Sequence, residues 1–363
     1  EAQQVIEVRG QNRYVTPGLI DIHTHVAYGA QTKGVGMQCC DPDEAGVLSG
    51  VTTVLDCGSV GVANIGVFPA HILPRAKTRV IVFLNVGSYA HTMPNPGDLN
   101  SIDEIDREAI AGCVNANRGL IKGIKLRLVG PIMDERGEEI IRLSKEIACE
   151  HHLPLMVHIG DMRARERSNP QHTGELTRSL LRTFTEHDVL THLCTPHVGG
   201  VLDAARQPVP ELSEARSKGV VLDPALGMGN FGYEIAREQA QMGLHPDTLS
   251  SDLTAGGALR FSLMECMAKF MAVGYGVKDV VRMTTANAAK AIGMENELGA
   301  LKVGREADVT IMDVVPGKFK FVDTIQQVFT GDWGIAPVQT IRAGEMFAPR
   351  WGTHPWGWLP EAV

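Results

Sequence analysis

The chain has 363 residues, of which 44% are hydrophobic and 21% are charged, a globular composition that excludes disordered and fibrous architectures. Its 34 basic and 42 acidic side chains give a formal net charge of −8. Because no Lys/Arg-rich run offsets this charge, we expect no nucleic-acid partner. Because no apolar stretch reaches the roughly 20 residues that span a bilayer, we expect no membrane partner.

Short apolar runs recur along the chain, each with the length and β-branched content of a buried parallel strand. Their starts are mostly about 30 residues apart, the size of one βα unit. Helical spacing of apolar residues fills several gaps, at 102–114, 138–148 and 257–273. The predicted strands are 18–23, 51–56, 80–85, 123–128, 155–159, 189–193, 220–223 and 248–252. Eight strands alternating with helices predict an α/β fold, a (β/α)8 TIM-type barrel.

The pattern changes after about residue 295, where 304–313, 319–324 and 337–347 are typical of antiparallel strands with turns. We therefore predict a small β-sandwich appendage formed by the chain ends, residues 1–15 and 296–363, beside a barrel domain at 16–295. A strand near 6–8 would join it, and the Trp- and Pro-rich end would form an arm. The chain enters a core strand soon after Glu1, so we expect the N-terminal strands to be incomplete and an upstream segment to exist.

Seven cysteines are scattered without a C-x-x-C pair. An odd count without framework spacing is typical of reduced thiols. The first ten residues also lack the basic and apolar segments of a secretory signal. Both observations predict a cytoplasmic protein.

The first chemical signal is His23-Thr-His25 at the end of the first barrel strand. Alternation puts both imidazoles on the same side of the strand, where they can converge on one metal ion. A lone H-x-H pattern also occurs by chance as surface or core histidines. Its position after an apolar strand favours the metal.

Three further residues close predicted strands: His158 the fifth, His192 the sixth and Asp252 the eighth. In a barrel the carboxyl ends of the strands meet at one mouth, where active sites are built. Four histidines and an aspartate at matching strand ends therefore indicate a metal centre rather than isolated core histidines. Zn, Mn and Fe would all accept this mixed donor set.

Lys125 lies in a very apolar strand, where an unpaired charge would cost several kcal/mol, on the order of the penalty for other buried ions. Alternation places Lys125 and Arg127 on one face. An ion-paired structural lysine and a functional lysine both fit, and beside a metal site a carboxylated Lys125 is attractive. Arg127 would share the barrel interior or bind an anionic substrate group.

Several phrases resemble the amidohydrolase superfamily: PGLIDIHTH at 17–25, GVTTVLDCGS at 50–59 and GREADVTI at 304–311. Three others resemble its amidohydrolase/deacetylase branch, often called dihydroorotase-like: GIKLR at 123–127, DVLTH at 188–192 and PDTLSSD at 246–252. The resemblance covers about residues 15–345. It departs at Ala225-Leu-Gly, where the branch has Gly-His-Gly, and at Leu253, where the branch often has His. These departures leave the metal ligands unchanged and concern substrate contacts.

The resemblance implies two divalent metal ions per subunit, expected to be Zn2+. His23 and His25 would hold the more buried ion with Asp252. His158 and His192 would hold the second, and Lys125, as N6-carboxylysine, would bridge both. A hydroxide shared between the metals would attack a carbonyl carbon, with Asp252 as general base and then acid.

Three weaker signals lie near the predicted mouth. Tyr28 and His197 are candidate substrate contacts, with packing and a sixth-strand role as the respective alternatives. The charged run 163–167 would either meet an acidic substrate or, as we expect, form a solvated loop.

Together these features predict a metal-dependent hydrolase of amide or ester bonds in a small anionic molecule, of the deacetylase or acyl-ester hydrolase type. The alternatives are a cyclic-amide hydrolase, dihydroorotase-like, and a non-catalytic scaffold on the same fold. We expect a homo-oligomer.

Overall fold

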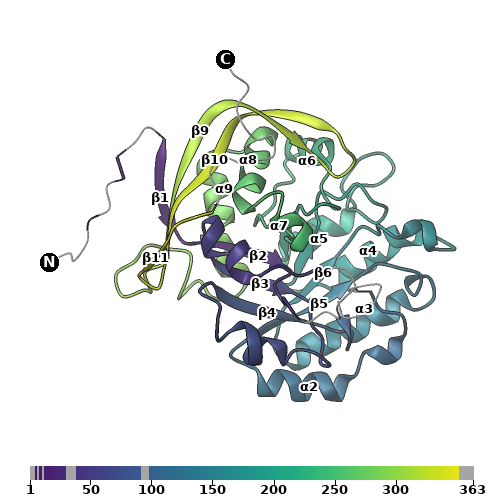
Figure 1. The fold of residues 1–363 in the computed structure, drawn as a ribbon. Coiled ribbons are helices and arrows are strands. Elements are labelled where there is room, and N and C mark those ends of the chain that lie inside the picture. The colour runs from purple at the N-terminus through teal and green to yellow at the C-terminus, as the bar shows by residue number, and fades with distance from the viewer. Residues whose placement is uncertain (1–4, 6–7, 10–11, 30–37, 91–97, 351–363) are drawn as a thin grey trace.

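The computed structural model describes residues 5, 8, 9, 12–29, 38–90 and 98–350. Most of the strand expected at 6–8 and the whole arm at 351–363 lie outside them. Seven parallel strands pair in chain order to form a curled sheet (Figure 1). They are β2 (Leu19–Thr24), β3 (Val51–Cys57), β4 (Arg79–Asn85), β5 (Ile121–Arg127), β6 (Leu155–His158), β7 (Val189–Thr191) and β8 (Val221–Asp223). The first seven predicted barrel strands are confirmed.

The eighth predicted strand, 248–252, is not a regular strand. The segment nevertheless lies between the two edges of the sheet, because Asp252 N donates to His23 O at 2.7 Å and Gly227 N donates to Ser251 O at 2.8 Å. Thr24 and Leu253 form one isolated parallel bridge. Regular pairing stops where Asp252 adopts a left-handed backbone, with φ of 53°. The barrel is therefore closed by an irregular connection.

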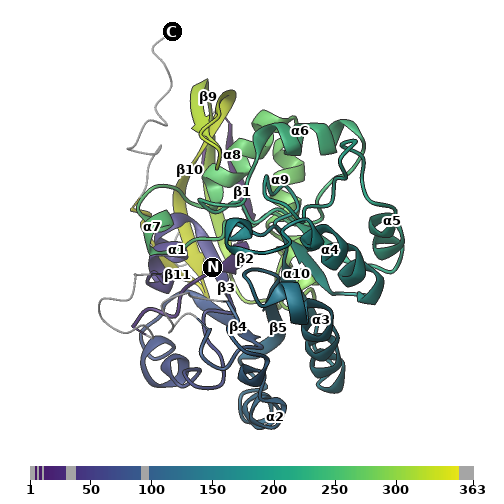
Figure 2. The ribbon, with the colours of Figure 1, turned by 90° about the vertical axis from the view of Figure 1, so that its right-hand side faces the viewer.

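Helices cover the outer face of the curled sheet, as Figures 1 and 2 show for α2 to α5. The α-helices of the described chain are α1 (Pro42–Ala45), α2 (Arg107–Ala116), α3 (Met133–Glu150), α4 (His172–Thr183), α5 (Pro210–Ser217), α6 (Tyr233–Gln241), α7 (Ala255–Ala258), α8 (Leu263–Val273), α9 (Val277–Met283) and α10 (Ala286–Ala291). None of the described helices is long and apolar enough to cross a membrane.

Two predicted helices are divided. The helix expected at 102–114 is a 3-10 turn followed by α2, because Asp106 caps a new helix by accepting from Ala109 N at 2.9 Å. The helix expected at 257–273 is α7 and then α8. The chain is extended at Ser262, with φ of −138° and ψ of 173°, so α8 begins after a break.

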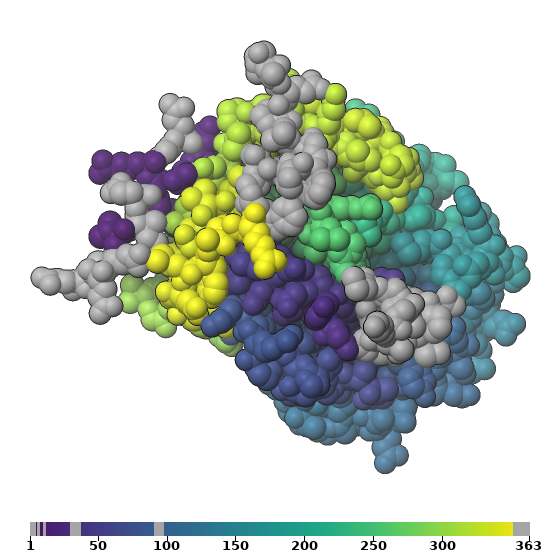
Figure 3. Space-filling view, viewed as in Figure 1, coloured from purple at the N-terminus to yellow at the C-terminus, as the bar shows by residue number. Residues whose placement is uncertain are grey.

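The chain ends form a four-stranded antiparallel sheet in the order β1 (Arg13–Pro17), β9 (Val309–Val322), β10 (Val328–Arg342) and β11 (Glu345–Phe347). The appendage predicted from the chain ends is confirmed as this sheet, although β9 is one long strand where two were expected, and residues 328–336 of β10 were not predicted as strand. In Figure 3 its C-terminal residues adjoin the early barrel segments, where Arg350 N donates to Leu48 O at 2.8 Å. The domain boundaries at 15 and 296 stay a prediction.

The inside of the barrel is filled by a cluster of apolar side chains that includes Ile20, Ile22, Leu55 and Phe83. A Cβ added at Gly123 would lie 2.6 Å from the ring of Phe83, so a larger residue there would displace the ring. This apolar cluster ends just before the carboxyl ends of the strands, and the polar residues of the predicted site lie beyond it, at the mouth of the barrel.

Candidate metal centre

An irregularity at the end of β2 aims its two histidines into the mouth. Ile20 and Ile22 belong to the cluster inside the barrel, so strict alternation would send His23 to the other face. The pairing of β2 with β3 changes register between Asp21 and Thr24, as in a β-bulge. His23 and His25 consequently both lie buried at the mouth.

Side chains from six positions converge there. Lys125 Nζ lies 3.4 Å from His23 Nε2. Asp252 Oδ1 lies 3.4 Å from His23 Nε2 and 3.3 Å from His25 Nε2. The ring of His192 lies 4.0 Å from that of His158 and 5.0 Å from that of His23, centroid to centroid. The structure thus brings together all six residues that the sequence suggested as metal ligands.

The second ring nitrogens are held by hydrogen bonds. His192 Nδ1 donates to Ala225 O at 2.8 Å, and because a carbonyl only accepts, Nδ1 carries the proton. His23 Nδ1 lies 2.9 Å from Thr191 Oγ1, and His25 Nδ1 lies 2.8 Å from Ser59 Oγ. These contacts direct the Nε2 atoms towards the centre.

The donor set fits a divalent metal. Nε2 of His158 and Nε2 of His192 are buried and have no hydrogen-bond partner within the described part of the chain. Burial lowers the pKa of His192 to about 3 and that of His158 well below its usual range, so both rings are neutral. Ligand atoms of His23, His25 and Asp252 lie within 4.8 Å of one another. Neutral imidazoles with a carboxylate are the ligands that zinc and related metals accept.

Lys125 is only 1% exposed. Among the described residues, no carboxylate forms an ion pair with its Nζ within 4.0 Å, so the alternative of an ion-paired structural lysine lacks its partner. Gly58 makes room for the side chain: its φ is +74°, and a Cβ there would lie 2.5 Å from Lys125 Cγ. The sequence showed this glycine but gave no sign of its contact.

The backbone at the centre is strained. His192, Ala225 and Asp252 have φ of 72°, 37° and 53°, in the left-handed region that costs about 1–2 kcal/mol for a residue with a side chain. A Cβ at Gly227 would lie 2.4 Å from Asp252 Oδ2, so this position also needs a glycine. Non-glycine residues in such conformations gather at functional sites.

A cavity of about 390 Å³ adjoins the centre and is lined by His25 and Asp252 together with Arg127 and Asp98. Arg127 Nε donates to Asp98 Oδ1 at 3.0 Å. Arg163 Nη1 donates to Asp98 Oδ2 at 2.7 Å. The side chain of Asp98 is 4% exposed, so one buried carboxylate holds two guanidinium groups at the wall. No pattern in the sequence pointed to Asp98.

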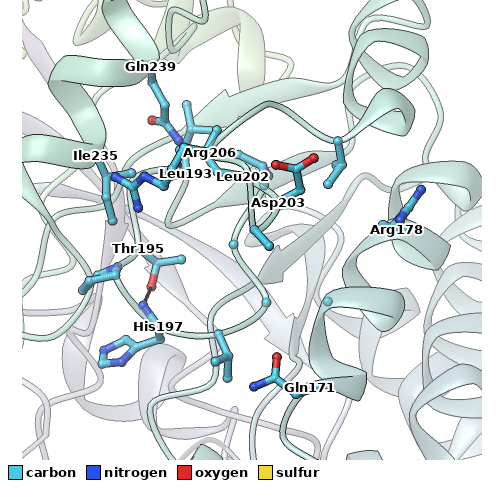
Figure 4. A pocket seen from close by; sticks show the side chains of 18 of the residues that line it. Gln171, Arg178, Leu193, Thr195, His197, Leu202, Asp203, Arg206, Ile235 and Gln239 are labelled. Atoms are coloured by element: carbon cyan, nitrogen blue, oxygen red, sulfur yellow. Dashed lines mark hydrogen bonds between the residues drawn. The ribbon is translucent and has the colours of Figure 1, made fainter.

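The other two suggested substrate contacts are not among the residues lining this cavity. Tyr28 is 49% exposed. His197 lines a separate cavity of about 350 Å³ (Figure 4), and its Nε2 donates to Gly229 O at 2.7 Å. The sixth-strand histidine that lies among the candidate metal ligands is His192 and not His197. The arginines Arg178 and Arg206 that line the Figure 4 cavity already have carboxylate partners.

The run 163–167 is only in part the solvated loop that we expected: Arg165 and Glu166 are exposed, but Arg167 is not. The side chain of Arg167 is fully buried and pairs with Asp134 at 2.7 Å and with Asp161 at 3.1 Å. Asp161 also accepts from Gly130 N at 3.3 Å. This network fixes the loop after β6, which carries Arg163 to the cavity.

Comparisons with known proteins agree with this geometry. The model of the amidohydrolase family matches residues 14–346. A deacetylase of Brucella anthropi is 30% identical over 356 residues, 95% of this chain and 84% of the relative. A deacetylase of Enterococcus faecalis is 27% identical, over 92% of this chain and 86% of the relative.

Two solved structures are also similar. An adenine deaminase has a TM-score of 0.83 at 26% identity, covering 94% of this chain and 88% of its own. A dihydroorotase has a TM-score of 0.80 at 28% identity, covering 96% and 86%. With a family match across nearly all of its length, the chain belongs to the amidohydrolase family and is a hydrolase.

Proposed function

We propose that the protein is a hydrolase that uses two divalent metal ions to cleave an amide or ester bond in a small anionic substrate, as a deacetylase or acyl-ester hydrolase. One observation carries the proposal: four imidazoles, Lys125 and Asp252 converge beside a cavity whose wall holds Arg127. The names of the two deacetylase relatives support the same reaction class.

In this proposal His23, His25 and Asp252 hold one ion, and His158 and His192 hold the other. Bound ions would lower the pKa of a water molecule towards neutrality and polarise the substrate carbonyl. The compact His23, His25 and Asp252 group supports the first site. The unpartnered Nε2 atoms of His158 and His192 support the second.

Lys125 is proposed to be carboxylated. Its neutral amine would attack carbon dioxide, forming an N–C bond and releasing one proton. The product is an anion that would offer two oxygen donors to the ions beside His23. A buried ammonium at this position, 3.4 Å from His23 Nε2, would first release one proton to form that amine. The two steps together would replace a buried cation with an anion and remove the cost of an uncompensated buried ammonium.

Asp252 is proposed to move the proton. Burial alone would raise the pKa of Asp252, but the imidazoles of His25 and His192 that face the carboxylate bring its pKa below the usual range. The group is therefore an available base. It would take the proton of the attacking water and give it to the leaving amine or alcohol. The N–H groups of Arg127 that face the cavity would bind the substrate carboxylate and orient the bond.

Metal analysis and a substrate panel test the proposal. We expect about two divalent ions per chain by elemental analysis, and turnover of N-acetyl amino acids or O-acetyl hydroxy acids. Growth with 13C-bicarbonate should give a carbamate signal by NMR that is absent in Lys125→Ala. Fewer than one ion per chain would instead favour a non-catalytic scaffold.

A cyclic-amide hydrolase is the second candidate. The dihydroorotase structure, at 28% identity and a TM-score of 0.80, supports it. Turnover of dihydroorotate without turnover of any acylated amino or hydroxy acid would favour this candidate and refute the first.

A further inference from the structure

Behind each histidine of the H-x-H pair a hydroxyl group connects the imidazole to a buried carboxylate. The first such connection runs from His23 through Thr191 to Asp223. Thr191 Oγ1 donates to Asp223 Oδ2 at 2.9 Å and lies 2.9 Å from His23 Nδ1. A threonine hydroxyl has one proton. Because that proton goes to Asp223, the oxygen is left to accept from His23, and Nδ1 must be the protonated nitrogen of the ring.

Asp223 is well placed to fix this direction. It is fully buried and accepts from three hydroxyls, because Ser250 donates to Oδ2 at 2.7 Å and Thr248 donates to Oδ1 at 2.8 Å. These donors come from β7 and from the connection that closes the barrel. The orientation of His23 on β2 is therefore tied to the opposite edge of the sheet.

His25 has the same kind of connection, through the hydroxyl of Ser59 to the carboxylate of Asp56. Its Nδ1 lies 2.8 Å from Ser59 Oγ. Asp56 accepts from Ser59 N at 3.0 Å and also interacts with the Ser59 hydroxyl. Asp56 is fully buried and accepts a hydrogen bond from Val26 N at 2.8 Å. This bond fixes Asp56 next to the segment that follows His25. Both histidines of the H-x-H pair thus have a hydroxyl and then a carboxylate behind them.

We propose that Thr191 with Asp223, and Ser59 with Asp56, are positioning residues that set the affinity of the centre for its metal. They hold His23 and His25 with the proton on Nδ1, so that Nε2 presents a lone pair to the ion. The inference rests on the proposed function, because it requires a metal at this centre.

The physical reason is the choice of tautomer. With the proton on Nε2, His23 would aim an N–H at Lys125 Nζ and at the ion. Without the Thr191 hydroxyl, His23 Nδ1 and Asp223 would each lose a partner in a fully buried place. Loss of such outer partners typically weakens metal binding by about 10–100-fold.

Variants that differ by one hydroxyl test this. Thr191→Val removes the hydroxyl at nearly constant volume, and Thr191→Ser keeps it. Thr177→Val is the matched control, because Thr177 is also buried and donates to backbone oxygens of α4 and Gly199, away from the centre. Zn2+ affinity is measured by competition with a chromophoric chelator, and the absorption of bound Co2+ reports the ligand geometry.

We expect the Zn2+ dissociation constant of Thr191→Val to rise by about 10–100-fold with a changed Co2+ spectrum, while Thr191→Ser and Thr177→Val stay near wild type. Equal weakening in Thr191→Val and Thr191→Ser, or in Thr177→Val, would overturn the inference. Wild-type affinity in Thr191→Val would overturn it too, while leaving the proposed function intact. A wild-type protein that binds no divalent metal would refute both.

Ser59, which lies between His25 and Asp56, gives an independent test if Thr191→Val does not fold. Ser59→Ala should also weaken Zn2+ binding. Ser49→Ala is its control, because Ser49 is equally buried and donates to the carbonyl of Ala45. Equal affinities for these two variants and wild type would contradict the role of Ser59.

Discussion

Gly58 is the position where a single methyl group tests the placement of Lys125. An alanine Cβ there would lie 2.5 Å from Lys125 Cγ and 2.8 Å from Lys125 Cβ. Because Cβ is fixed to the backbone of β5, the lysine cannot avoid the methyl by a change of rotamer alone. Gly58→Ala should therefore displace Lys125 from the centre.

The magnitude has two parts. An alanine at φ of +74° costs about 1–2 kcal/mol in backbone strain. Forcing a methyl into a filled interior typically costs about 1–3 kcal/mol more. Gly243 allows the backbone strain to be measured apart from the steric clash, because its φ is +75° and an added Cβ would meet no atom within 4 Å. Gly243→Ala should thus show the strain alone, and Gly58→Ala about 2–5 kcal/mol in total.

Urea unfolding and metal analysis measure both consequences. We expect Gly58→Ala to lose more unfolding free energy than Gly243→Ala and to bind less metal, because Lys125 would no longer lie beside His23 in the centre. Gly243→Ala should keep the metal content of wild type. If the two variants are equally stable and equally loaded, the assignment of Lys125 to the centre is wrong.

Three further results are expected. Asp98→Asn should raise the KM for an acidic substrate at least about tenfold with a smaller effect on kcat, because the hydrogen bond that orients Arg127 loses its charged acceptor; an unchanged KM would contradict this role. Chelation of the metal should abolish turnover and lower the melting temperature, with Zn2+ restoring both; a chelated enzyme of full activity would count against the proposed function. Burial alone would raise the pKa of Asp134, but hydrogen bonds from Arg167 and Ser168 lower it to about 2, so the pair stabilises the fold above the ordinary carboxyl pKa of about 4 and less as the pH falls through 2. Arg167→Met should lose about 3–5 kcal/mol of unfolding free energy at pH 7, and its difference from wild type should shrink towards pH 2; a constant difference would contradict this.

The four histidines of the centre were visible in the sequence because each lies at or just beyond the end of a strand. A strand is a local pattern, and parallel strands bring their carboxyl ends to one mouth whatever the loops do. His158 and His192 could therefore be placed by position alone. The register change at the end of β2, which aims His23 and His25 inward, has no comparable local signal.

The residues that the sequence hid depend on contacts between loops. Asp98 follows β4, Arg127 ends β5 and Arg163 follows β6, so the three side chains meet only when these parts of the chain have folded together. Arg167 lies in a run of charges that is typical of a solvated surface, and it is buried because Asp134 and Asp161 approach it from elsewhere. Hydrophobic periodicity carries no information about such pairs.

The segment that closes the barrel was assigned as a strand for a similar reason. Its apolar content and its position after seven strands predicted an eighth. In the structure the hydroxyls of Thr248 and Ser250 turn to Asp223, and Asp252 leaves the extended region. Side-chain hydrogen bonds of this kind compete with regular pairing.

Selection for stability alone would act against the left-handed backbone of His192, Ala225 and Asp252. Glycine would relieve about 1–2 kcal/mol of backbone strain at each position. At positions 192 and 252 the substitution by glycine would also remove a side chain that we propose as a metal ligand. Ala225 differs, because it gives His192 only a carbonyl oxygen, which glycine retains. Durability and catalysis thus conflict at two of these residues and are compatible at the third.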